Sequence, residues 1–417
     1  MFLAVLFVAA LSASSQLPPE VLREVRVQGN VLTPEEEVLR LSGVVVGAPV
    51  TAEMPAKVAD RLRATKRFEG VEVLKRFASI ADPSQIVLVI VVDEGPVTVQ
   101  ERGGPNGSPR VVRKRGVPLQ FLPMLDFEDG YGFTYGVRLA VPAPLGADSL
   151  VSFPATWGGE KQVGAELDLD RPKGMLGALS RFQVGGSLSR RENPYYEEDD
   201  DRARAWVRAE RAFVPWLRVG AVAGLQQVSF ADEPDRFNEL GADVVIDTRL
   251  DPALPRNAVY GRAAWSRLDF AREDAAHRTE MEARGYVGLV GQVVLAVSAQ
   301  RQDSSRSLPP YSRPLLGGMS TVRGFAAGSE VGDTLAAGSL EVLVPLSSPM
   351  SIGKLGVSAF VDAGAVYDKG QRLVDQRFRR GAGGAVWFSA AFVRAYLAVA
   401  HGIGGSTRTH FGTTLAF

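Results

Sequence analysis

The chain has 417 residues, with 47 basic and 47 acidic side chains, so its formal net charge is zero. This balance argues against a general affinity for nucleic acid, because nucleic-acid-binding domains are distinctly basic. The sequence contains no cysteine and only three histidines, which excludes disulfide frameworks and cysteine-ligated metals and argues against a histidine-rich metal site. We expect neither a metal nor another cofactor.

Residues 1–16 begin with the long apolar run MFLAVLFVAALSA. The run is shorter than the roughly 20 residues that a membrane-spanning helix needs. Small residues follow it, as at a signal-peptidase site, although the usual basic start is absent. We predict a signal peptide over residues 1–16 and a mature protein that is periplasmic, secreted or a membrane barrel; the alternative is a frayed or misassigned start.

Residues 22–98 have the pattern of a small α/β domain. A short strand, REVRVQGN, precedes a helix with Thr33 as its N-cap and Gly43 as its stop. A second helix extends from Thr51 to about Ala64. The segments FEGVEVLKRF and IVLVIVVDEGP then complete a β-α-α-β-β order, and no catalytic site is evident in it.

Residues 99–117, VQERGGPNGSPRVVRKRGV, form a linker rich in Gly and Pro that ends in a basic cluster. Two interpretations remain open for this cluster. It contacts anionic lipid head groups, or it is part of a solvated linker, which we favour.

From residue 118 to residue 417 the helical period is replaced by a period of two. In WLRVGAVAGLQQVSF and KLGVSAFVDAG, apolar residues alternate with polar or small ones. This pattern fits a half-buried sheet, and in a membrane barrel the apolar set faces lipid while the polar set faces the lumen.

Sixteen such segments begin near residues 118, 131, 149, 160, 178, 202, 217, 236, 258, 276, 291, 334, 355, 380, 392 and 409. Odd-to-even connections such as NPYYEEDDD are long and polar, whereas VPW, GQ and SA on the opposite end are short; PKGMLGALS and RLDPALPRN are longer exceptions. Barrels combine short periplasmic turns with long external loops, and a soluble β-sandwich predicts no such alternation. We therefore predict a mainly β protein, a 16-stranded antiparallel transmembrane β-barrel over residues 118–417 preceded by the small domain.

A glycine-rich loop, LLGGMSTVRGFAAGSEVGDTLAAG, lies between the eleventh and twelfth segments and carries Arg323, Gly324 and Phe325. Alternation places Glu341 and Asp362 of the next two strands in the lumen. If the loop folds inward, its planar guanidinium can bind both carboxylates. The alternative is an exposed loop with unrelated lumen charges.

The sequences of the first and last strands predict that few backbone hydrogen bonds join them at the seam where the barrel closes. Pro118 and Pro123 lack the N–H that a ladder needs, and Gly412 interrupts the last strand. Simple fraying of the first strand is the alternative. The chain ends in HFGTTLAF, with Phe411, Leu415 and Phe417 on one face.

These motifs carry a resemblance. Gly-Gly followed by Val-Arg-Gly-Phe, then Leu-Glu and Phe-Val-Asp-Ala-Gly, resembles the BamA/TamA family of outer-membrane assembly proteins, also called the bacterial surface antigen family. Gly29-Asn30 and the closing VDEGP make the first domain similar to a POTRA domain. The resemblance implies that Arg323 docks on Glu341 and Asp362, that the seam is a lateral gate, and that the aromatic end is a barrel signal. Relatives typically have three or five POTRA domains, whereas this chain has room for one.

The resemblance implies a non-enzymatic assembly factor in the outer membrane of a Gram-negative-type bacterium, with the POTRA-like domain in the periplasm. Its expected partners are unfolded outer-membrane β-barrel polypeptides and outer-membrane lipid, with periplasmic chaperones or accessory lipoproteins as further candidates. The alternative is a secretion pore that exports a partner polypeptide. A plain porin has neither the docked loop nor the first domain, and the Gly-x-Ser-x-Gly motif of a fused lipase is absent.

Overall fold

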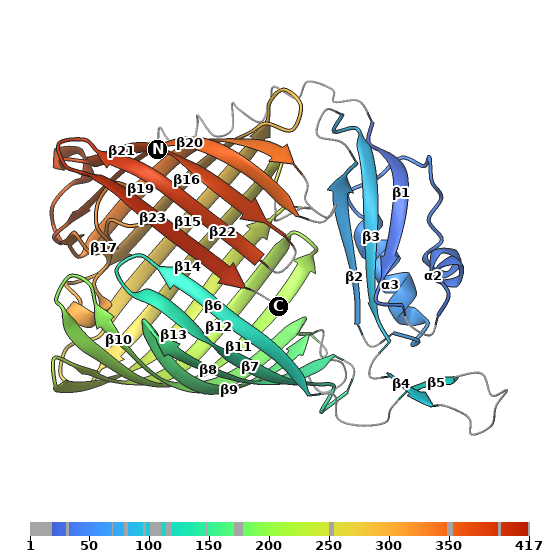
Figure 1. Cartoon of the computed structure of the whole chain (residues 1–417). Helices are drawn as coiled ribbons and strands as arrows, with labels where there is room; N and C mark the ends of the chain where they lie inside the picture. Colours follow the sequence, from blue (N-terminus) through green and yellow to red (C-terminus); the bar gives the residue numbers. More distant parts are fainter. Residues whose placement is uncertain are drawn as a thin grey trace. The chain divides into compact units, whose positions relative to one another are not determined.

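The computed structural model describes residues 19–30, 33–68, 70–78, 82–94, 97–100, 110–113, 119–146, 148–170, 178–249, 254–347, 353–390 and 393–415. The predicted signal peptide, Pro118 and Phe417 lie outside these ranges. The chain divides into two compact units, Met1–Gly116 and Val117–Phe417 (Figure 1). No helix in the described ranges is long and apolar enough to cross a membrane.

The first unit is a three-stranded sheet with two helices. In chain order its elements are β1 (Val21–Gln28), α2 (Glu35–Ser42), α3 (Met54–Ala64), β2 (Gly70–Phe77) and β3 (Gln85–Asp93). The central strand β3 is parallel to β1 and antiparallel to β2. The predicted β-α-α-β-β order is therefore confirmed, and β1 and β2 are the edge strands.

Both helices pack on this sheet through an apolar core in which Leu62 of α3 and Ile90 of β3 are fully buried. Gly43 ends α2 with a φ of 62°, as the sequence predicted. The prediction of Thr33 as the N-cap was wrong. Pro34 holds that position, because its backbone is extended (ψ 144°) and its carbonyl accepts from the N–H of Val38 at 3.2 Å. Thr33 precedes the cap, and its N–H donates to Glu94 Oε1 at 2.8 Å.

The predicted linker contains a short antiparallel ribbon. Strand β4 (Val97–Gln100) pairs with β5 (Arg110–Arg113). The pairing brings the two ends of the Gly- and Pro-rich stretch together. The middle of that stretch and the last two residues of the basic cluster lie outside the described residues.

The second unit is a closed barrel of sixteen antiparallel strands, in which each strand pairs with its neighbours in sequence and β23 pairs with β6 (Figure 1). The strands are β6 (Gln120–Glu128), β7 (Gly132–Pro142), β8 (Ser149–Gly158), β9 (Glu160–Asp170), β10 (Arg181–Asn193), β11 (Glu198–Val214), β12 (Leu217–Phe230), β13 (Glu233–Asp247), β14 (Ala258–Phe270), β15 (Ala276–Gly288), β16 (Val294–Ser304), β19 (Thr334–Ser347), β20 (Lys354–Tyr367), β21 (Arg379–Ser389), β22 (Val393–Gly402) and β23 (Thr407–Leu415). The predicted fold is confirmed, and each strand begins within a few residues of its expected start.

The outer face of the barrel is apolar and its inner face is polar. On β13, the outward-facing Leu240 and Val244 are 58% and 41% exposed, whereas the inward-facing Glu239 and Asp243 are buried. This distribution reverses that of a water-soluble sheet and is the arrangement of a barrel surrounded by lipid.

Two connections carry structure of their own. The β16–β19 connection contains the 3-10 helix η1 (Pro310–Ser312) and the short paired strands β17 (Leu315–Leu316) and β18 (Glu330–Val331). The β20–β21 connection contains η3 (Leu373–Asp375). The first of these is the glycine-rich loop singled out in the sequence, hereafter the inner loop (residues 305–333).

We predict that Leu62→Ala lowers the free energy of unfolding of the first unit by about 2–5 kcal/mol, because it opens a cavity between α3 and β3. The described α-helices all belong to this unit, so circular dichroism at 222 nm during urea titration of the full chain follows its unfolding. An unchanged midpoint would contradict the packing described here.

Candidate functional site

The inner loop has a defined fold. The β17–β18 pair closes its base, and the N–H of Gly318 donates to the carbonyl of Phe325 at 3.0 Å across the tip. Thr321 Oγ1 accepts from the N–H of Gly317 at 2.7 Å and donates to the carbonyl of the same residue at 2.8 Å. Four glycines of the loop have positive φ: Gly317, Gly318, Gly324 and Gly328. The tip therefore has a backbone course that depends on glycine.

Arg323 projects from this tip, and each of its five N–H groups has a partner. Nε and Nη2 donate to the two carboxylate oxygens of Asp362, both at 2.7 Å. Nη1 donates to Glu341 Oε2 at 2.9 Å and to the Tyr396 hydroxyl at 2.5 Å. Nη2 also donates to Ser339 Oγ at 2.9 Å. The hydroxyl of Tyr396 in turn donates to Glu341 Oε1 at 2.8 Å, so the cluster is closed.

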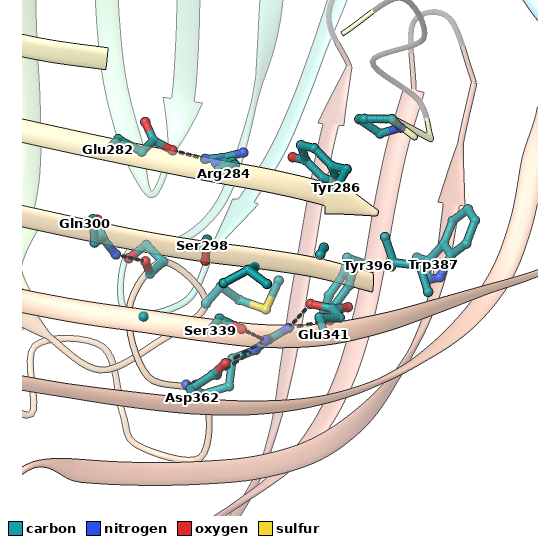
Figure 2. A pocket seen from close by; sticks show the side chains of 18 of the residues that line it. Glu282, Arg284, Tyr286, Ser298, Gln300, Ser339, Glu341, Asp362, Trp387 and Tyr396 are labelled. Atoms are coloured by element: carbon teal, nitrogen blue, oxygen red, sulfur yellow. Dashed lines mark hydrogen bonds and ion pairs between the residues drawn. The ribbon is translucent and has the colours of Figure 1, made fainter. Parts of the chain in front are cut away.

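The partners of Arg323 come from three strands of the barrel wall and point toward one another (Figure 2). Ser339 and Glu341 lie on β19, Asp362 on β20 and Tyr396 on β22. Arg323 is 6% exposed and Asp362 is 4% exposed. A buried guanidinium needs this degree of pairing, because an unpaired buried charge is strongly destabilising.

The face of the guanidinium is also covered. Its central carbon lies 3.3 Å from the centre of the Phe360 ring on β20. The N–H of Arg323 donates to Asp362 Oδ2 at 3.0 Å, so both the backbone and the side chain of this residue are fixed to one carboxylate. The arrangement holds an arginine in place and leaves no carboxylate poised as a general acid or base.

Two glycines allow the tip to approach the wall. A Cβ at Gly324, which has a φ of 95°, would lie 2.6 Å from the backbone nitrogen of Gly402. A Cβ at Gly381 of β21 would lie 1.9 Å from the carbonyl oxygen of Arg323. Real Cβ atoms do not come this close, so a side chain at either position would displace the tip.

Sequence reasoning identified Arg323, Glu341 and Asp362 but missed other residues that hold the tip. Ser339 and Phe360 each lie two residues before a predicted partner, so period-two alternation places them on the same lumen face. Tyr396 had no such signal, because it lies on a strand distant in sequence from both motifs.

Phe325 and the apolar residues of the loop complete the docking. Leu316 and Val322 are fully buried with Leu335 of β19, and Phe325 packs against this cluster. The ring of Phe325 also approaches Gly402, where an added Cβ would lie 2.9 Å from it. Apolar burial therefore supplements the charged contacts at both ends of the Val-Arg-Gly-Phe motif.

A cavity of about 790 Å³ adjoins the Arg323 cluster in the lumen. Tyr286, Trp387 and Tyr396 line one end of it (Figure 2). A space of this size holds a ligand or a short peptide segment rather than a folded domain.

The opposite part of the lumen wall carries charges of both signs in pairs. Arg208 binds Asp243 at 2.9 Å, and Arg278 binds Glu239 at 3.1 Å. Ion-selective channels use rings of one sign. This paired wall gives no support to a charge-selective porin.

The seam between β6 and β23 has few ladder pairs. Only Thr413–Phe127 and Thr414–Asp126 are paired among the described residues, whereas every other neighbouring pair of barrel strands shares six or more. Both pairs lie at the ends of their strands, so the first part of β6 has no partner in the described part of β23.

The predicted seam residues occupy this region. Pro123 lies in the part of β6 that pairs only with β7, opposite Val137. Gly412 pairs with Tyr396 of β22 and not with β6. Neither residue belongs to the two described seam pairs, and their effect on the seam stays a prediction.

The predicted aromatic end of the chain is described in part. The ring of Phe411 lies 5.4 Å from that of Phe127 across the seam and is 38% exposed. Leu415 pairs with Val393 at the end of β23.

The barrel has an apolar exterior and a polar lumen, and a buried arginine holds its long loop inside. These features define an outer-membrane β-barrel protein with an internally docked loop. The family model described as the Omp85 superfamily domain matches residues 134–410. The chain belongs to the Omp85 superfamily and is an outer-membrane protein of the Gram-negative type. The predicted resemblance to BamA/TamA-like proteins is confirmed at this level. Members of the superfamily are non-enzymatic transporters and assembly factors.

Solved structures have the same fold. BamA from Haemophilus ducreyi lacking POTRA domains 1-3 is similar with a TM-score of 0.62 and 14% identity, over 95% of this chain and 84% of that chain. CdiB from Escherichia coli is similar with a TM-score of 0.53 and 14% identity, over 97% of this chain and 92% of that chain. No curated protein matches the sequence. At this identity the structural similarity shows the fold alone.

We predict that Arg323→Ala releases the inner loop. The change leaves Asp362 and Glu341 buried without a counter-charge, and breaking a buried pair in this way costs about 3–5 kcal/mol. Limited proteolysis of the reconstituted protein should then cut within residues 315–331 much faster. Arg323→Lys should be intermediate, since lysine has no planar fork.

The matched control is Arg372→Ala, which removes an exposed ion pair with Asp375 and should leave the cleavage rate unchanged. Equal cleavage of the Arg323→Ala and wild-type loops would show that the Arg323 cluster does not hold the loop.

Proposed function

We propose that this protein is an outer-membrane assembly factor that assists the insertion and folding of β-barrel proteins through a lateral gate between β6 and β23. The observation that carries the proposal is the seam, which among the described residues has two ladder pairs where every other pair of neighbouring barrel strands has at least six. Breaking this seam costs fewer hydrogen bonds than opening the barrel anywhere else.

The chemistry of the gate follows from the cost of unpaired backbone in lipid. Each unsatisfied N–H or C=O group costs several kcal/mol in the hydrocarbon region. The unpaired part of β6 offers such groups to an incoming strand, which can pair by β-augmentation. A client strand that pairs before it enters lipid avoids much of this penalty.

The docked loop supports the gate. Arg323, with Glu341 and Asp362 as its partners, fixes the tip of the loop to β19 and β20. The loop thereby stays inside the barrel while β6 and β23 separate. Pro123 and Gly412 contribute by limiting the seam, and the C-terminal residues around Phe411 serve as the signal by which this barrel is itself assembled.

The first unit is the proposed site of client delivery. We assign it as a single POTRA-like domain, residues 22–98, in the periplasm, connected by residues 99–117 to the barrel at residues 118–417. The start of β1 is covered by residues 47–50, whereas strand β2 has no further strand beyond it among the described residues. An extended, unfolded polypeptide can add to such an edge. Periplasmic chaperones or accessory lipoproteins are the further partners of this proposal.

A secretion pore is the second candidate, because the same barrel and loop would also serve to export a polypeptide through the lumen. The cavity beside the Arg323 cluster favours this candidate as a path, whereas the weak seam favours insertion. In both cases we expect no enzymatic activity; in the Arg323 cluster both carboxylates, Glu341 and Asp362, are tied to one arginine.

Reconstitution in liposomes tests the proposal. Folding of an urea-unfolded outer-membrane barrel should be accelerated by the wild-type protein relative to empty liposomes, and Arg323→Ala should lose most of the acceleration. Acceleration that survives in Arg323→Ala would leave the assembly function standing and remove the role of the docked loop. No acceleration by the wild type would count against insertion.

A reversible lock separates the two candidates. The chain contains no cysteine, so Asp126→Cys with Thr414→Cys introduces a single cross-strand pair at a position of known register. Oxidation should abolish client insertion, and a reductant should restore it. Polypeptide export through the lumen of the oxidised protein would instead support the secretion pore.

A further inference from the structure

His410 joins the inner loop to both sides of the seam. It lies on β23 and is 1% exposed, the least exposed polar side chain of that strand among the described residues. Its Nε2 accepts from the N–H of Gly324 at 2.9 Å, and its Nδ1 lies 2.6 Å from Asp129 Oδ2. Gly324 is at the loop tip, and Asp129 follows β6 in the turn to β7.

The two contacts determine where the imidazole proton lies. A backbone N–H can only donate, so Nε2 must be the unprotonated nitrogen. Nδ1 then carries the hydrogen and donates it to the carboxylate of Asp129. One neutral side chain thus accepts from the loop and donates to the β6–β7 turn while its own backbone belongs to the last strand.

The inner loop packs on both sides of the same seam. A Cβ at Gly130 of the β6–β7 turn would lie 2.6 Å from the methyl carbon of Ala327. A Cβ at Gly412 of β23 would lie 3.3 Å from the terminal methyl of Met319. The loop therefore covers the junction, and His410 is the point at which loop, first hairpin and last strand meet.

We propose that His410 and Asp129 form a clasp that holds the seam closed in the absence of a client, and that the docked loop positions this clasp. The inference deepens the proposed gate and rests on it. Among the described residues the seam has two ladder pairs and the ring contact between Phe127 and Phe411, so the bridge from His410 is a substantial addition to what joins the two strands. Separation of the strands must break the bridge between His410 and Asp129, whereas the contact between His410 and Gly324 can persist on the β23 side.

Hydrogen exchange of the reconstituted full chain, without client, tests the clasp. Amides exchange through local opening, so their rates follow the open population. In His410→Ala and Asp129→Ala, peptides from residues 120–128 and 407–415 should exchange about tenfold faster, as expected for loss of one hydrogen bond to a charged group. Peptides from β12 and β13 should be unchanged.

Three further variants keep the test specific. His410→Gln retains one acceptor and one donor and should stay near the wild-type rate. His401→Ala removes an exposed histidine of the neighbouring strand and should have no effect. The amide of Gly324 should lose protection in His410→Ala but keep it in Asp129→Ala, because only the first change removes its acceptor.

A disulfide across the seam should rescue the His410→Ala variant. Oxidised Asp126→Cys with Thr414→Cys, added to His410→Ala, should return the exchange of both strands to the wild-type rate. Unchanged exchange of β6 and β23 in both clasp variants would overturn the proposal. An equal rise in every barrel strand would also overturn it, since it would assign His410 to general stability. Because no client is present, these outcomes are independent of the insertion assay.

Discussion

The structure depends on one constraint, that backbone N–H and C=O groups within lipid must be paired. Among the described residues, fifteen of the sixteen strand junctions have six or more ladder pairs, and the junction between β6 and β23 has two. A barrel in lipid should have no open strand edge, yet this barrel keeps part of one at the junction between β6 and β23. Three features of the structure occur at this junction. They are the inner loop, the offset of the end strands and the contacts of His410.

The Arg323 cluster shows how a charged group is kept inside such a barrel. Two carboxylates, two hydroxyls and an aromatic ring surround one guanidinium. Buried ion pairs often add little net stability over an apolar equivalent, but they tolerate only one arrangement of partners. The cluster therefore specifies where the loop docks more than how stable the barrel is. This specificity matters because the same loop also contacts the seam.

The fold could be predicted from sequence because alternation is a local signal. The sixteen segments and the loop between the eleventh and twelfth strands follow from period two and from connection length. Glu341 and Asp362 were found because alternation along their strands places them in the lumen, and the docking of Arg323 was implied by the resemblance of its loop motif to a known family. Tyr396 and His410 were not found, because their roles depend on how the strands align with one another once the barrel has closed. The N-cap was misassigned at Thr33, which instead contacts Glu94, a residue distant in sequence.

The bridge between His410 and Asp129 joins residues 281 positions apart, nearly the whole length of the barrel segment. Contacts of such high sequence separation form late in folding, because the chain between them must be ordered first. During its own biogenesis this barrel must therefore pass through a stage in which fifteen ladders exist and the loop has no final anchor on the last strand. That nascent intermediate has the same open edge that the mature protein would present to a client. The protein would thus enter the membrane by the kind of step that we propose it performs on its clients.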